Sequence, residues 1–140
     1  MFKFEKLVFG DLGWGDELLL ATLMTITVSI LSMGLGLCLA IVTVWAKLIT
    51  NRIARLIANF YTTVVRGVPE LLVIYLIFFG GNSIVMSVAK LFGYNGYIEL
   101  NALTIGTIAI AFISATYSSE VIRAAYLSVN KGQVEAAKAL

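Results

Sequence analysis

The sequence contains no histidine, and among its 140 residues it has one cysteine, Cys38, and one proline, Pro69. The missing histidine excludes histidine acid–base catalysis and histidine-ligated metal sites, and a single cysteine cannot form an internal disulfide. Charged residues are also scarce, at 13% of the chain, and they leave a net charge of only +2. So small and dispersed a charge does not predict nucleic-acid binding. We predict no metal site and no bound cofactor.

Hydrophobic residues are abundant instead: they make up 60% of the chain, and the mean hydropathy is +0.96. Soluble domains are apolar over about half of their residues. A chain this short cannot bury so much apolar surface inside its own core. Lipid or other apolar helices must cover the excess, so we predict an all-α membrane protein.

Long segments without charge give the candidate membrane spans. Leu18–Ala46 is a run of 29 uncharged positions, and 100–119 is a further run of 20. About 20 apolar residues are enough to cross the hydrocarbon core as a helix. Both runs therefore predict spans, over residues 18–46 and 100–120.

The span between these two can be placed in two frames. Residues 71–89 carry no charge, but Gly80-Gly81-Asn82-Ser83 interrupts them with residues that are typical of turns. A frame over 60–80 avoids that interruption but carries Arg66 and Glu70 near one end. We favour the frame over 60–80.

Basic residues near the span ends predict the orientation. Seven lie around the connection after the first span or after the third span, and three lie elsewhere, so we predict an external amino terminus. The predicted order is an external segment 1–17, span 18–46, cytoplasmic connection 47–59, span 60–80, external loop 81–99, span 100–120 and cytoplasmic segment 121–140. The seven are Lys47, Arg52, Arg55, Arg66, Arg123, Lys131 and Lys138, against Lys3, Lys6 and Lys90.

Small residues repeat at four-residue spacing in the first and third spans. Such faces let membrane helices approach closely, although small residues are also common in membrane helices in general. We predict a helix–helix contact on each face. The faces are Ser32, Gly36 and Ala40 in the first span, and Thr107, Ala111, Ala115 and Ser119 in the third.

Ionisable residues at membrane depth are costly and therefore point to function. Arg66 and Glu70 either contribute to a substrate path or neutralise each other on one helix face, and Glu70 could also be a helix-start acid directly after Pro69. Glu120 and Arg123 likewise either contribute to a substrate path or form a structural pair at the membrane interface. The candidate path residues are Arg66, Gly67, Pro69, Glu70, Glu120 and Arg123.

Three segments resemble one protein family. Gly-Gln-Val-Glu-Ala-Ala-Lys-Ala-Leu at 132–140 resembles the opening of the EAA loop, the sequence mark of permease subunits in bacterial ABC importers. Tyr-Thr-Thr-Val-Val-Arg-Gly-Val-Pro-Glu-Leu at 61–71 resembles the Arg-Gly-Val/Thr-Pro segment of polar amino acid permeases of the histidine and glutamine type. Tyr-Ser-Ser-Glu-Val-Ile-Arg-Ala-Ala at 117–125 resembles the segment that precedes their EAA loop. The most similar branch carries histidine, arginine, lysine or opines such as octopine.

The resemblance implies a type I ABC importer permease in the bacterial inner membrane. It implies a second permease subunit, a periplasmic solute-binding protein and an ABC ATPase as partners; the ATPase, and not this chain, would hydrolyse ATP. Family members usually have five spans, so the chain would be an amino-terminal portion that ends within the EAA loop. Two other interpretations stay open, a small transporter repeat outside the ABC class and an inactive gene fragment. The residues that would couple to the ATPase are Gly132, Glu135, Ala136 and Ala137.

Overall fold

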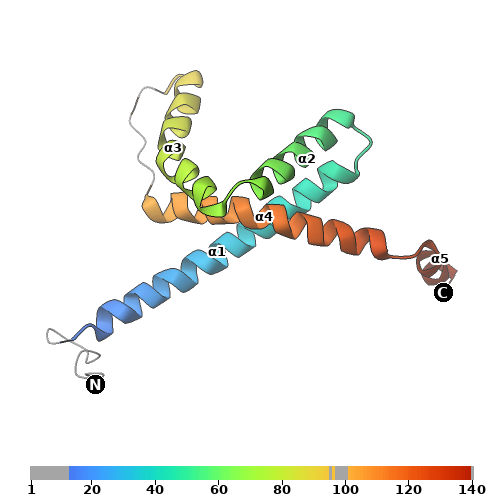
Figure 1. Ribbon diagram of the computed structural model, residues 1–140, viewed down its shortest axis with the longest axis horizontal. Coiled ribbons are helices and arrows are strands. Elements are labelled where there is room, and N and C mark those ends of the chain that lie inside the picture. Colours follow the sequence, from blue (N-terminus) through green and yellow to red (C-terminus); the bar gives the residue numbers. More distant parts are fainter. Residues whose placement is uncertain (1–12, 95, 97–100, 140) are drawn as a thin grey trace.

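The computed structural model describes residues 13–94, 96 and 101–139, and these residues form an all-α fold (Figure 1). Three of its helices are long and apolar enough to cross a membrane, in agreement with the number of spans expected from the sequence. Most of the predicted external segment 1–17 lies outside the described residues. The helices are α1 (Gly15–Leu48), α2 (Arg52–Gly67), α3 (Glu70–Leu91), α4 (Ala102–Ser128) and α5 (Lys131–Ala139).

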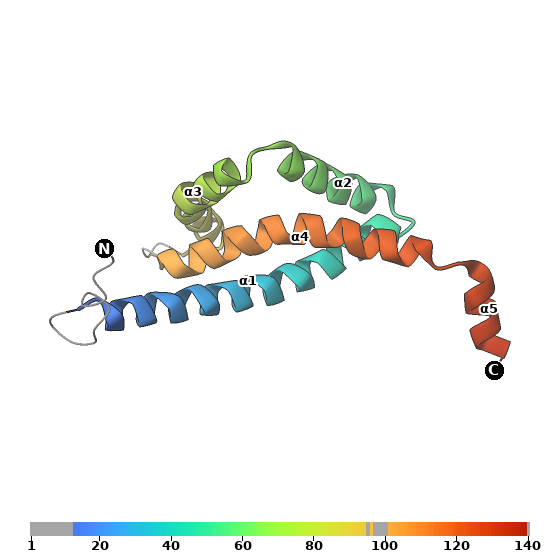
Figure 2. The same ribbon diagram turned by 60° about the horizontal axis from the view of Figure 1, so that its bottom comes forward.

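Helices α1 and α4 form the main contact of the fold and run in the same direction (Figure 2). The Ser32 hydroxyl of α1 donates to the Thr107 carbonyl of α4, and further along both helices Lys47 meets Glu120. Two helices that cross a membrane in the same direction require the chain between them to return once. The parallel arrangement therefore fits alternating spans.

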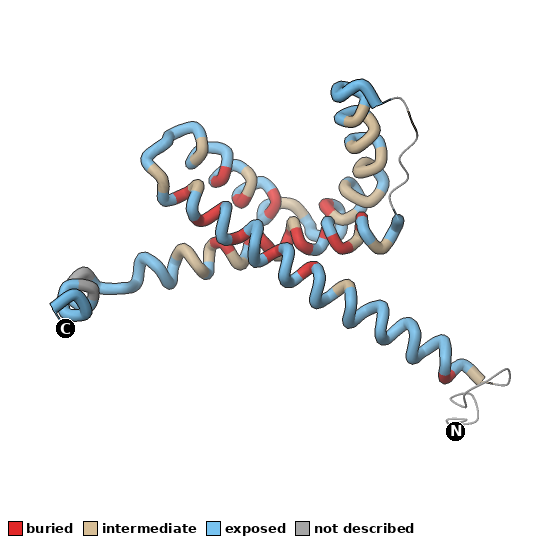
Figure 3. Tube along the Cα trace, turned by 180° about the vertical axis from the view of Figure 1, so that it is seen from behind, coloured by how far each residue is buried: buried red, intermediate tan, exposed pale blue. Residues whose placement is uncertain are grey.

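The two predicted small-residue faces meet each other, and together they form the small-residue seam: Ser32, Gly36 and Ala40 of α1 against Thr107, Ala111, Ala115 and Ser119 of α4. All seven residues are buried, so the prediction of a helix–helix contact is confirmed. A Cβ atom placed on Gly36 would lie 3.1 Å from the Ala111 carbonyl oxygen and 3.2 Å from the Ser114 Cβ. The two helices therefore approach closely at Gly36, where a side chain would require its neighbours to shift. Figure 3 shows buried residues gathered where α1, α2 and α4 meet, while most of the N-terminal half of α1 is exposed.

The single helix predicted over 60–80 is wrong, because the chain breaks at Val68 and Pro69. Helix α2 ends at Gly67, Val68 is extended with φ −111° and ψ 143°, and α3 begins at Glu70. Proline has no N–H to donate within a helix, and its ring disfavours helical geometry at the preceding residue. The proline thus separates α2 from α3.

Helix α3 passes through the Gly80-Gly81-Asn82-Ser83 segment that was expected to interrupt it, so residues 81–91 are helical instead of belonging to an external loop. A helix tolerates glycine more readily in lipid, where every backbone group must find a partner inside the chain. The Ser87 hydroxyl donates to the Ser83 carbonyl at 2.8 Å and adds a further hydrogen bond to this turn. The membrane-compatible helix of this region is therefore Glu70–Leu91.

Two further boundaries differ from the expectation. Helix α2 begins at Arg52, so the connection predicted over 47–59 is mostly helical; the Asn51 side chain caps it by accepting hydrogen bonds from the amides of Ile53 and Ala54. Helix α4 continues to Ser128, well beyond residue 120. Glu120 and Arg123 consequently lie inside a helix and not after its end.

Candidate functional site

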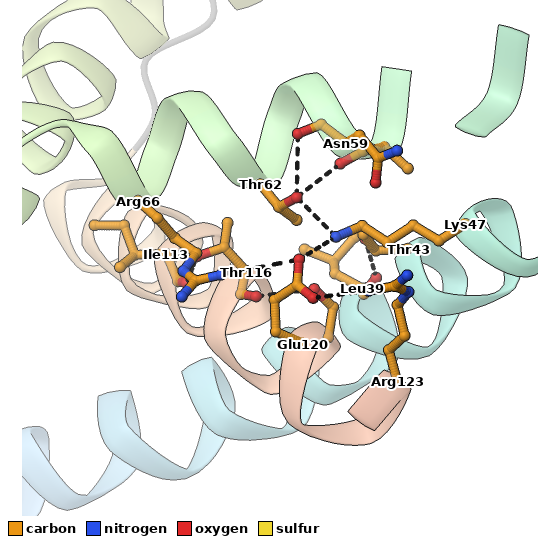
Figure 4. Close-up of polar contacts among 12 residues, drawn as sticks. Leu39, Thr43, Lys47, Asn59, Thr62, Arg66, Ile113, Thr116, Glu120 and Arg123 are labelled. Atoms are coloured by element: carbon orange, nitrogen blue, oxygen red, sulfur yellow. Dashed lines mark hydrogen bonds and ion pairs between the residues drawn. The ribbon is translucent and has the colours of Figure 1, made fainter. Parts of the chain in front are cut away.

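The side chain of Lys47 lies at the point where α1, α2 and α4 meet (Figure 4). Only 2% of this side chain is exposed. Its ammonium group donates to the Glu120 carboxylate at 2.5 Å and to the Thr62 hydroxyl at 2.7 Å. The Thr62 hydroxyl in turn donates to the Ala58 carbonyl at 3.1 Å. A buried charge requires this kind of pairing and hydrogen bonding to be tolerated.

Glu120 also attracts two arginines, and the four side chains form the charged cluster: Lys47, Arg66, Glu120 and Arg123. The Arg66 guanidinium lies 3.9 Å from one carboxylate oxygen and the Arg123 guanidinium 3.7 Å from the other. Both arginine side chains are nearly half exposed, at 46% and 44%, whereas that of Glu120 is 29% exposed. Three cations face one carboxylate, so the cluster carries an excess of positive charge.

Tyr117 connects the cluster to the start of α3. The Arg66 guanidinium lies 5.7 Å from the centre of the Tyr117 ring, a cation–π contact. The Glu70 side chain lies near the Tyr117 hydroxyl. Glu70 lies in the first turn of α3, where the helix dipole favours an acid. Arg66 forms its ion pair with Glu120, so the simple Arg66–Glu70 pair is replaced by contacts through α4.

The structure brings together most of the candidates that the sequence suggested. Arg66, Glu120 and Arg123 meet in the charged cluster, and Glu70 lies near Tyr117, whose ring contacts Arg66. Gly67 and Pro69 flank the break between α2 and α3. Lys47, Thr62 and Tyr117 were not among the candidates.

A sequence signal for Lys47 did exist. Gly36, Ala40, Thr43 and Lys47 are spaced by four, three and four residues and are all buried, so Lys47 continues the helix face of the small-residue seam. A charged residue on that face must point into the helix contact and requires a partner there. The basic residue was counted only as a marker of orientation.

The residues expected to couple to an ATPase lie apart from the cluster. Helix α5 leaves the end of α4 and points away from the other helices (Figure 2). The Asn130 side chain accepts a hydrogen bond from the Gly132 amide at 3.2 Å at the start of this helix. Gly132, Glu135, Ala136 and Ala137 are exposed. Within the described ranges, no group of three or more acidic, histidine or cysteine side chains could hold a metal ion.

Comparison with known proteins identifies relatives over almost the whole chain. The chain is 47% identical over 135 residues to the nopaline transport system permease protein NocQ of Agrobacterium fabrum, which covers 96% of this chain and 57% of that protein. It is 35% identical over 127 residues to the histidine/lysine/arginine/ornithine transport system permease protein HisQ of Escherichia coli, covering 91% of this chain and 55% of that protein. The chain thus spans about half the length of the curated relatives it matches.

A solved structure shows the same arrangement of helices. It is the crystal structure of an amino acid ABC transporter with histidines, with a TM-score of 0.65 and 30% identity, over 84% of this chain and 49% of that one. Residues 32–140 match the family described as the inner membrane component of binding-protein-dependent transport systems. On this match and these relatives, the chain belongs to the family of binding-protein-dependent transport system inner membrane components.

Proposed function

We propose that this chain acts within the permease subunit of an ABC importer that carries amino acids or opines across a bacterial inner membrane. The observation that carries the proposal is the 47% identity to a nopaline permease over 96% of the chain. The similarity of the helix arrangement to an amino acid ABC transporter supports it. The permease would perform no bond chemistry, and a partner ATPase would supply the energy.

The relatives favour a cationic or opine substrate. Two of them are named for the transport of nopaline and of histidine, lysine, arginine and ornithine. We therefore propose that basic amino acids or opines are carried in preference to neutral amino acids. A second permease subunit and a periplasmic solute-binding protein would complete the path and deliver the substrate.

Reconstitution tests this proposal. The permease assembled with an ATPase and a solute-binding protein in liposomes should take up labelled arginine or nopaline only when ATP and the binding protein are both present. Uptake that follows an ion gradient without ATP would instead indicate a transporter outside the ABC class. Absence of any uptake of arginine or nopaline would contradict the proposed function.

The second part of the proposal is that α5 docks on the ATPase. Its exposed alanines, Ala136 and Ala137, leave a small surface for close approach, and Glu135 offers a directional charged contact to a basic groove. Glu135→Lys should reverse that attraction and lower uptake per ATP hydrolysed while insertion is unchanged. Gln133→Lys, which adds a charge nearby on the same exposed helix, is the matched control. Equal effects of both substitutions would contradict a specific role for Glu135.

The third part concerns orientation, with the amino terminus outside. The excess of basic residues on the predicted cytoplasmic side supports it, although Lys47, Arg66 and Arg123 are engaged with Glu120. Four basic residues outside the charged cluster, Arg52, Arg55, Lys131 and Lys138, still oppose three. With Cys38 replaced, an impermeant thiol reagent should label a cysteine at position 96 in intact cells and spare one at position 52. The reverse pattern would overturn this orientation.

A further inference from the structure

Lys47 is the most deeply buried charged side chain among the described residues, and the family comparison gives it no role. It lies in the last turn of α1, where a cation is favoured by the helix dipole. An exposed position would satisfy that preference at no desolvation cost. The Lys47 side chain instead occupies the interior and contacts both α2 and α4.

The distances rank the partners of Glu120. Lys47 lies within hydrogen-bond distance of the carboxylate at 2.5 Å, whereas Arg66 and Arg123 stand at 3.9 and 3.7 Å. Contacts longer than about 3.5 Å are not hydrogen bonds. In this conformation Lys47 therefore holds Glu120, and the two arginines contribute only through charge.

The partners also differ in the helix that carries them. Lys47 belongs to α1, so its bond with Glu120 ties α4 to α1, and the bond with Thr62 ties both to α2. Arg123 belongs to α4 itself and moves together with Glu120. If α4 shifts relative to α1, Glu120 loses Lys47 but keeps a cation beside it. Lys47 therefore opposes a shift of α4 relative to α1, whereas Arg123 does not.

Helix α4 leads directly to α5, which begins at Lys131 soon after α4 ends at Ser128. Among the described helices, α5 connects to the others through the C-terminal part of α4, which carries Glu120. From this geometry we infer that Lys47 is a positioning residue for energy coupling. It holds α4 at Glu120 against α1 and α2. When α4 moves, Arg123 replaces Lys47 as the closest partner of the Glu120 carboxylate. The inference rests on the proposed function.

The test uses the assembled transporter in liposomes and measures ATP hydrolysis and uptake together. Lys47→Met keeps most of the length of the side chain but removes the bond to Glu120, and uptake per ATP should fall by about tenfold, a size typical of coupling between sites. Lys47→Arg keeps the charge and should retain most of the coupling. Lys90→Met, at an exposed lysine near the end of α3, is the matched control and should change nothing.

A double variant separates positioning from stability. Lys47→Met alone leaves a carboxylate without its closest partner, whereas Lys47→Met with Glu120→Gln removes both charges. The double variant should recover stability in detergent but keep the low uptake per ATP. If the double variant recovers both stability and uptake per ATP, Lys47 has only a structural role and the inference is overturned. Wild-type uptake per ATP in a stable Lys47→Met variant would also overturn it. Wild-type protein that shows no uptake dependent on ATP and the binding protein would contradict the proposed function itself, and the inference with it.

Discussion

The contact between α1 and α4 has two parts that are held together by different forces. In the small-residue seam, the helices approach closely at Gly36, and apart from the Ser32 hydrogen bond to Thr107 the seam depends on close packing of small groups. In the charged cluster, long side chains from α1, α2 and α4 converge on Glu120. Packing of small groups sets how close the helices lie, and the directional ion pair sets how far one helix is shifted along the other. The two parts should therefore fail in different ways when they are changed.

The largest loss is expected in the charged cluster. Glu120→Leu would leave the buried ammonium of Lys47 without an anion, and removal of one partner of a buried pair costs about 3–5 kcal/mol. Unfolding of the purified protein in mixed detergent micelles would measure the change in free energy. Glu17→Leu, at an exposed acid in the first turn of α1, should cost less than about 1 kcal/mol. Equal losses for the two substitutions would mean that Lys47 does not depend on Glu120.

A smaller loss is expected in the small-residue seam. Gly36→Leu would place a side chain against the Ala111 carbonyl, only 3.1 Å from the new Cβ, and excess volume of this kind costs about 1–3 kcal/mol. Gly34→Leu is the matched control on the same helix, because no atom lies within 4 Å of a Cβ at that position. The same unfolding measurement applies. A seam variant as stable as the control would show that α1 and α4 do not approach closely at Gly36.

The same comparison explains what the sequence could predict. The seam was predictable because small residues at four-residue spacing act locally, through one face of one helix. Glu120 and Arg123 were predictable as ionisable residues at membrane depth. The helix face of Lys47 was predictable, but its partners were not, because Thr62 and Glu120 are distant from it in the sequence and a basic residue at the end of an apolar run is usually at the interface.

The position of the break between α2 and α3 was also not predictable from the sequence alone. Pro69 and Gly80-Gly81 both interrupt the apolar region, and the sequence alone does not rank them. In the structure the proline ends one helix and precedes the next, whereas both glycines remain helical. A missing backbone donor and a steric clash outweigh the flexibility of glycine, particularly where backbone groups must be satisfied within the chain.

The smallest effect is expected at Glu70, where the charged cluster meets the start of α3. Glu70 is exposed, lies in the first helical turn and lies near the Tyr117 hydroxyl, so its charge is accounted for by local structure. Glu70→Gln keeps the size of the side chain and much of its hydrogen bonding, and loss of the dipole interaction should cost about 0.3–1 kcal/mol. Competition uptake in the reconstituted transporter should show the same ranking of arginine, lysine and glutamine as the wild type. Tyr117→Phe, which removes the nearby hydroxyl but no charge, should lower stability by no more than this amount and also leave the ranking unchanged. A selective loss of arginine and lysine uptake in Glu70→Gln, absent in Tyr117→Phe, would instead place the Glu70 carboxylate in the substrate path and extend the role of the cluster from helix position to substrate choice.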